Sequence, residues 1–176
     1  MSPADALAVL RALAVIPIWY AVAYDERGWA IAIFGIAAVT DAVDGWLARR
    51  SPLSKHGGLI DPIADKILVL GTALALVFAG LEHGVVIPPE LFALLAVREV
   101  TSGVIRLSGY HDGTHRSADG VGKLKTAAEL TALAVLIVVR PPAPLGVAAI
   151  SLLWIAVLFG LVTLAQYWSH GRRRLS

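Results

Sequence analysis

The sequence contains no cysteine and few charged residues. Without cysteine, the chain has neither a disulfide nor a thiolate metal site. Charged residues make up 16% of the chain, compared with about 25% of a typical soluble domain. Hydrophobic residues make up 57%, and the net charge is only +2. The composition therefore indicates a membrane protein with lipid contacts, and we expect no nucleic-acid partner.

Two further patterns are missing. The amino terminus lacks a basic segment followed by an apolar run and a small-residue cleavage site, so we expect residues 1–24 to form a retained helix and not a signal peptide. No internal repeat is evident, which disfavours an inverted-repeat transporter. The length predicts one transmembrane domain over residues 1–176, without a large soluble appendage.

Long apolar runs are the main feature that the chain does contain. A helix needs roughly 20 mostly apolar residues to cross a bilayer, and these runs do not alternate as the strands of a membrane barrel do. Polar joints that contain glycine or proline separate them. The sequence therefore predicts an all-α integral membrane bundle of six transmembrane helices. The expected ranges are 6–24, 29–47, 62–81, 88–107, 121–139 and 143–168.

Lysine and arginine are concentrated in alternate connections. Basic residues occur in residues 49–55, at Arg116 and in residues 172–174, whereas the intervening connections offer only Arg27 and Arg140. Basic loops of a membrane protein stay on the cytoplasmic side. We therefore expect a multi-pass protein of the cell (inner or plasma) membrane with both termini in the cytoplasm. The tail arginines are interpreted as a topology signal and as contacts to anionic lipid.

Four aspartates lie at the facing ends of the second and third apolar runs. Asp41 and Asp44 are three residues apart, and Asp61 and Asp65 are four apart, so each pair shares one face of a helix. The short connection predicts antiparallel neighbouring helices, which would gather the four carboxylates near the cytoplasmic ends. Close carboxylates repel one another unless cations or protons intervene. Oxygen ligands suit Mg²⁺ or Mn²⁺, so a divalent-metal site for a diphosphate is expected.

The residues around these aspartates suit a phosphate ligand. Gly45 lets a substrate approach the backbone closely, and Ala48 continues the small surface. Arg49 provides a planar fork for a phosphate at the membrane boundary. The alternative is a set of aspartates neutralised by nearby lysines and arginines without metal, but such pairing requires neither the glycines nor the spacing.

This segment resembles the signature of the CDP-alcohol phosphotransferase family, D-x-x-D-G-x-x-A-R followed by G-x-x-x-D-x-x-x-D. The gap between the two halves is one residue shorter than in the family pattern. The amino terminus departs from one branch of the family, the bacterial phosphatidylglycerophosphate synthases, because Ser2 and Ala8 stand where that branch usually has asparagine and threonine ahead of Arg11. All the fixed positions are present: Asp41, Asp44, Gly45, Ala48, Arg49, Gly57, Asp61 and Asp65.

The resemblance extends beyond the signature, to the bacterial phosphatidylglycerophosphate synthase branch of the family. It covers nearly the whole chain and implies a six-helix fold, a homodimer, and transfer of a phosphatidyl group from CDP-diacylglycerol to an alcohol with release of CMP. The matching segments are residues 38–41, 59–66, 98–100, 122–126 and 166–167.

The resemblance also implies roles for individual residues. Two divalent ions, Mg²⁺ or Mn²⁺, would be held by the four aspartates, and Asp65 would also be the base for the attacking hydroxyl. CDP-diacylglycerol would be bound by Gly45, Arg49 and Ser54, although Ser54 is equally well explained as an ordinary loop serine.

Basic residues on the fourth and fifth apolar runs favour an acceptor that carries a phosphate. We expect Arg106, Lys123 and Lys125 to bind glycerol 3-phosphate, with positive-inside anchoring as the alternative for the two lysines. Arg98 lies deeper, and it is expected to pair with Glu99 or Glu129 or to line the cavity.

Four competing functions remain open at this point. The acceptor could be inositol phosphate or serine, within the same reaction class. A membrane prenyltransferase also uses aspartates and metal, but with different spacing. Intramembrane carboxylates could line an ion transporter. The last alternative is a family member that has lost activity, which the complete set of aspartates disfavours.

Overall fold

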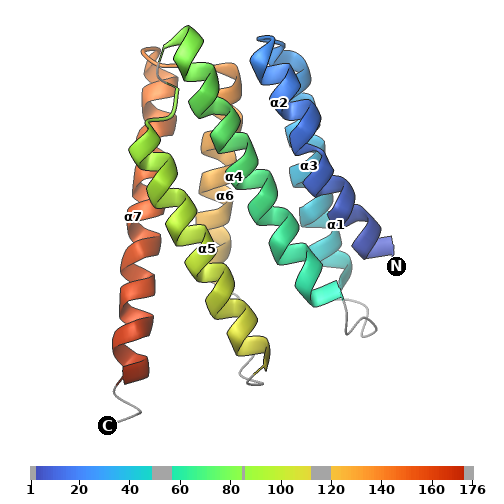
Figure 1. Ribbon diagram of the computed structural model, residues 1–176, viewed down its shortest axis with the longest axis vertical. Coiled ribbons are helices and arrows are strands. Elements are labelled where there is room, and N and C mark those ends of the chain that lie inside the picture. The colour runs from blue at the N-terminus through green and yellow to red at the C-terminus, as the bar shows by residue number, and fades with distance from the viewer. Residues whose placement is uncertain (1–2, 49–56, 85, 112–119, 173–176) are drawn as a thin grey trace.

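The computed structural model describes residues 3–48, 57–84, 86–111 and 120–172. These residues form helices and short connections, and no strand occurs among them (Figure 1), which confirms the predicted all-α class. The helices are α1 (Pro3–Leu13), α2 (Val15–Ala23), α3 (Arg27–Ala48), α4 (Gly57–His83), α5 (Pro89–His111), α6 (Gly120–Val138) and α7 (Pro144–Arg172).

The first apolar run forms one helix that is interrupted at Ala14, between α1 and α2. Backbone hydrogen bonds continue across the interruption, from Ala14 N to the Leu10 carbonyl and from Ile18 N to the Ala14 carbonyl. Pro17 has no N–H to donate to the carbonyl four residues earlier, which belongs to Leu13. The interruption thus lies where the proline removes one helical hydrogen bond.

The helices run up and down the bundle (Figure 1). The amino ends of α1, α4 and α6 and the carboxyl ends of α3, α5 and α7 lie at one end of the molecule. The described helix ends that flank the basic connections therefore share an end, as the charge distribution predicts. We call it the site end, because α3 finishes and α4 begins there with the aspartate motif.

Helices α3 and α4 are antiparallel, as expected, but each makes its main contacts elsewhere. α3 packs against α2 and α6, and α4 packs against α1, α2, α5 and α6. α1–α2 and α6 contact both helices and flank them.

The helix ends extend the predicted ranges on the site side. α4 begins at Gly57, ahead of the predicted start at Pro62, and α5 continues to His111. Asp61 and Asp65 are consequently both helical and share a face, as are Asp41 and Asp44 near the end of α3.

Three helical segments are long and apolar enough to cross a membrane: Asp5–Ala23, Ile63–Leu81 and Pro144–Val162. Large apolar side chains such as Ile16, Ile36 and Ile155 are exposed on the outside of the bundle, which suits contact with lipid. The chain is therefore a membrane protein. Helices α5 and α6 carry the charged residues Arg98, Glu99 and Glu129.

At the end opposite the site end, one acidic residue joins two connections between helices. Asp25 accepts a hydrogen bond from Arg27 Nε at 2.9 Å, and Arg140 Nη2 lies 2.8 Å from the same carboxylate oxygen. Arg27 also donates to the Val138 carbonyl at 3.2 Å. The two cations predicted for this side thus tie the α2–α3 turn to the α6–α7 connection.

Close approach of α1–α2 to α4 depends on Gly71. A Cβ built on Gly71 would lie 2.5 Å from Val15 Cγ1. The Gly71 carbonyl accepts a hydrogen bond from Trp19 Nε1 at 2.8 Å, and the Trp19 ring packs against Phe78. Small residues at such contacts allow helix backbones to approach one another in a membrane.

Replacing Gly71 by alanine is expected to destabilise the protein by about 1–3 kcal/mol, the usual cost of overpacking. The Cβ would clash with Val15, a short and stiff side chain. The measurement is the midpoint of thermal unfolding of purified protein in detergent. Gly35→Ala is the matched control, because nothing lies within 4 Å of its Cβ position. Equal midpoints for the two variants would contradict this account of the contact.

Candidate active site

The four aspartates of the predicted metal site lie on two helices whose ends share the site end (Figure 1). Asp41 and Asp44 belong to the last turns of α3, and Asp61 and Asp65 to the first turns of α4. The backbone thus carries both carboxylate pairs at the same end of the bundle. The side chains of Asp41, Asp44 and Asp61 lie outside the described part of the structure, whereas that of Asp65 lies within it.

Asp65 is held by an arginine from the first helix. Arg11 Nη1 donates to Asp65 Oδ1 at 3.2 Å, and the Arg11 side chain is completely buried. The Asp65 side chain is 38% exposed. A buried guanidinium beneath a partly exposed carboxylate fixes the orientation of that carboxylate.

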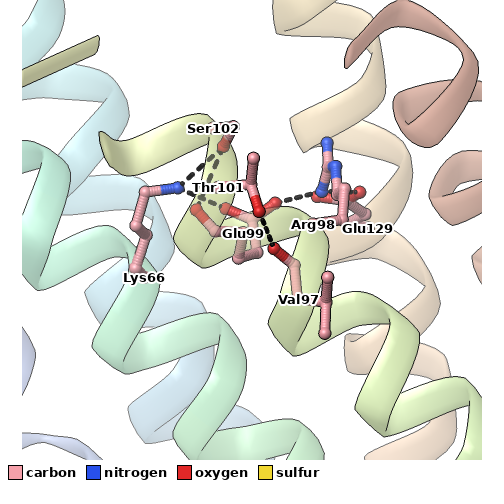
Figure 2. A network of polar contacts seen from close by, with 7 residues as sticks. All are labelled: Lys66, Val97, Arg98, Glu99, Thr101, Ser102 and Glu129. Atoms are coloured by element: carbon pink, nitrogen blue, oxygen red, sulfur yellow. Dashed lines mark hydrogen bonds and ion pairs between the residues drawn. The ribbon is translucent and has the colours of Figure 1, made fainter. Parts of the chain in front are cut away.

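A chain of ion pairs crosses the interior next to this carboxylate, from α4 through α5 to α6 (Figure 2). Lys66 Nζ donates to Glu99 Oε2 at 2.6 Å and to Ser102 Oγ at 3.1 Å. Arg98 Nη1 donates to the other Glu99 oxygen and, at 2.5 Å, to Glu129 Oε1. The expectation that Arg98 pairs with Glu99 or Glu129 is confirmed, because it contacts both.

Of the three residues predicted to bind the acceptor, the structure describes the side chain of one, Lys125. Lys125 lies on α6 one turn before Glu129, and its Nζ approaches Arg98 beside Gly160 of α7. The side chains of Arg106 and Lys123, and residues Arg49 and Ser54, lie outside the described part, as does any contact of Gly45. Their assignment stays a prediction.

The donor set suits a hard divalent cation. Four carboxylates at helix ends on the same side of the bundle offer oxygen ligands of the kind that Mg²⁺ and Mn²⁺ prefer, and the exposed face of Asp65 leaves that carboxylate accessible. Among the described side chains, no three acidic or histidine residues converge on a point that could hold a metal. The candidate ligands therefore fit the ion by type and by helix position.

Comparison with known proteins identifies the protein family of this chain. The family model described as CDP-alcohol phosphatidyltransferase matches residues 1–162. The chain belongs to the CDP-alcohol phosphatidyltransferase family. It is therefore a transferase of phospholipid biosynthesis, and members of this family generally depend on a divalent metal ion.

Curated relatives carry a more specific name. A protein of Salmonella paratyphi A named CDP-diacylglycerol–glycerol-3-phosphate 3-phosphatidyltransferase is 35% identical over 173 residues, covering 94% of this chain and 93% of the relative. A protein of Escherichia coli K12 with the same name is 35% identical over 176 residues, covering 96% and 94%. The similarity thus extends over almost the full length of each relative.

For a CDP-alcohol phosphatidyltransferase, the residue that the sequence motifs leave without a role is Arg11. The family signature begins only at Asp41, so it does not include the first helix. The sequence feature that could have pointed to Arg11 is its position within an otherwise apolar run. A charged residue inside a membrane segment usually faces a cavity or a counter-charge. Lys66 and its two partners on α5 are a second group that the motif alone does not connect to the site.

Replacing Arg11 by methionine is expected to lower the rate of CMP release from the CDP-alcohol substrate about ten-fold or more. A hydrogen bond to a charged group contributes about 1.5–3 kcal/mol, and its loss would remove the contact that orients Asp65 Oδ1. Arg27→Met is the matched control, because Arg27 also pairs with an aspartate, at the opposite end of the bundle. Equal losses of rate in folded protein for both variants would contradict a specific role for Arg11.

Proposed function

We propose that the chain transfers the phosphatidyl group of CDP-diacylglycerol to glycerol 3-phosphate, forming phosphatidylglycerophosphate and CMP. The observation that carries this proposal is the full-length similarity to relatives named for that reaction. The complete aspartate signature supports it, because each catalytic carboxylate expected from the motif is present in this chain.

Asp65 is the base of the reaction. Its carboxylate removes the proton of the attacking acceptor hydroxyl, and Arg11 holds it in the orientation that this step requires. The hydroxyl oxygen then forms a bond to the phosphatidyl phosphorus. The bond from that phosphorus to the bridging oxygen breaks, and CMP leaves with the electron pair.

Asp41, Asp44, Asp61 and Asp65 would hold two divalent ions, Mg²⁺ or Mn²⁺. When bound, such ions neutralise the diphosphate and stabilise charge on the leaving phosphate. The helical spacing supports this role, because each pair of aspartates lies on one face near the end of its helix. Gly45 gives the diphosphate access to the backbone of α3, and Arg49 and Ser54 bind the cytidine diphosphate.

Arg106, Lys123 and Lys125 bind the phosphate of the acceptor. Lys123 and Lys125 lie in the first turns of α6 and Arg106 in the last turns of α5, and both helix ends are at the site end. A basic cluster at this position suits a phosphorylated alcohol better than serine, which carries no phosphate.

The whole chain acts as one transmembrane domain with six spans, in which α1 and α2 together make the first. The site end faces the cytoplasm of a cell membrane, because the basic connections adjoin it. The enzyme works as a homodimer, by analogy with its family.

The first test is CMP release by purified protein with CDP-diacylglycerol and Mg²⁺, comparing glycerol 3-phosphate, inositol 1-phosphate and serine. Release that requires glycerol 3-phosphate is expected. Asp65→Asn should lower it at least about 100-fold, the contribution typical of a general base, whereas Asp25→Asn at the other end should not. Release with a different acceptor would replace the acceptor assignment. No release by folded protein with any alcohol would favour the ion-transporter alternative.

A separate prediction concerns the metal. Chelation with EDTA is expected to reduce CMP release to background, and added Mg²⁺ or Mn²⁺ should restore it, because four carboxylates repel one another without cations. Asp61→Asn should raise the Mg²⁺ concentration needed for half-maximal rate, since one ligand loses its charge. Undiminished activity in EDTA would contradict the metal-dependent mechanism.

A further inference from the structure

Gly160 on α7 adjoins two cationic side chains from two other helices. A Cβ built on this glycine would lie 2.5 Å from Arg98 Nε, 2.6 Å from Lys125 Nζ and 2.8 Å from Lys125 Cε. Real Cβ atoms essentially never show contacts this short. The absence of a side chain at Gly160 thus creates a notch in which the ends of Arg98 of α5 and Lys125 of α6 lie close together.

Arg98 cannot move easily out of this notch. Its side chain is 3% exposed, and its Nη1 is bound to carboxylates of both Glu99 and Glu129. Arg98 Nε is buried beside the notch and has no hydrogen-bond partner. The guanidinium is therefore held at Nη1 by two carboxylates, while Lys125 reaches the notch with the flexible end of a long chain.

The expected ion-pair partner of Lys125 on its own helix is Glu129, but Glu129 pairs with Arg98 instead. Glu129 follows Lys125 by four residues, the spacing at which a lysine and a glutamate on one helix commonly pair. Glu129 binds Arg98 at 2.5 Å, and none of the ion pairs among the described residues includes Lys125. Two neighbouring cations destabilise each other, which an anionic ligand would relieve.

We propose that Gly160 is a positioning residue, whose notch holds the Lys125 ammonium against the anchored Arg98 guanidinium so that it meets the phosphate of the acceptor alcohol. This inference rests on the proposed function, in which Lys125 binds that phosphate. It adds Gly160, Arg98 and Glu129, which act through Lys125 and do not themselves touch the reacting atoms.

A methyl group at Gly160 would displace the two cations unequally. Arg98 Nε lies 2.5 Å from the new carbon and is held by its carboxylates, so Gly160→Ala is also expected to lower stability. The Lys125 ammonium is the group that can move away. Gly160→Ala should consequently weaken acceptor binding while leaving the α3 and α4 aspartates, and with them CDP-diacylglycerol, unaffected.

The experiment measures KM separately for the two substrates, using full-length protein and the phosphorylated acceptor that supports CMP release by the unsubstituted chain. Gly160→Ala is expected to raise KM for the acceptor about ten-fold, the effect of losing one charge-assisted contact. KM for CDP-diacylglycerol should stay within about two-fold of the unsubstituted value, because that substrate meets other residues. Gly35→Ala, whose Cβ position is open, is the matched control and should change neither.

A double variant distinguishes a positioning role of Gly160 from a role in helix packing. In a Lys125→Met background, adding Gly160→Ala should cause no further rise in acceptor KM, because residues that act through one another do not add. If Gly160→Ala alone fails to fold, this double variant provides the test. The shorter, uncharged methionine removes the contact with Lys125, and only the contact with Arg98 Nε remains to be accommodated.

Several outcomes would overturn the inference: an unchanged acceptor KM in Gly160→Ala, an equal rise in KM for both substrates, a full additional rise in the Lys125→Met background, or misfolding of the double variant. These outcomes differ from failure of the proposed function. That failure appears in the unsubstituted chain, as CMP release with no acceptor or only with one that carries no phosphate, and it would remove the basis for the notch as well.

Discussion

Ionised side chains inside an apolar bundle need counter-charges, and this constraint organises the interior of the protein. Lys66, Arg98, Glu99 and Glu129 satisfy one another across α4, α5 and α6. Transfer of such groups from water is costly, and removing one member of a buried pair leaves an uncompensated charge. The three helices are consequently held in one relative position, next to the turn of α4 that carries Asp65.

The two ends of the bundle use charge differently. At the end opposite the site, Asp25 is shared between Arg27 and Arg140, and these contacts join two connections. At the site end, Asp65 keeps an exposed face although Arg11 binds it, and Glu129 is committed to Arg98 rather than to Lys125. One end is thus joined by its own ion pairs, while at the other end the Asp65 carboxylate stays partly exposed.

Much of the fold follows from local features of the chain. The apolar runs predicted the position of every described helix, with the largest differences at the site-end termini, because roughly 20 apolar residues are what a bilayer requires. The predicted antiparallel course of α3 and α4 is found, and α1–α2 and α6 flank both helices. A short connection limits the distance between two helix ends, but side-chain volume decides which helices touch. At Gly71, the missing Cβ lets Val15 and Trp19 approach α4.

The sequence by itself determined the reaction class, because the aspartate signature is a local pattern whose spacing sets helix faces without reference to the rest of the chain. It also singled out Asp65 and limited the partners of Arg98 to two glutamates. Only the tertiary structure decided that Arg11 supports Asp65, that Arg98 takes both glutamates, and that Gly160 brings Arg98 and Lys125 together. The physical reason is that these contacts join residues on different helices, most of them far apart in the chain. Their distances depend on how whole helices pack, which no local spacing encodes.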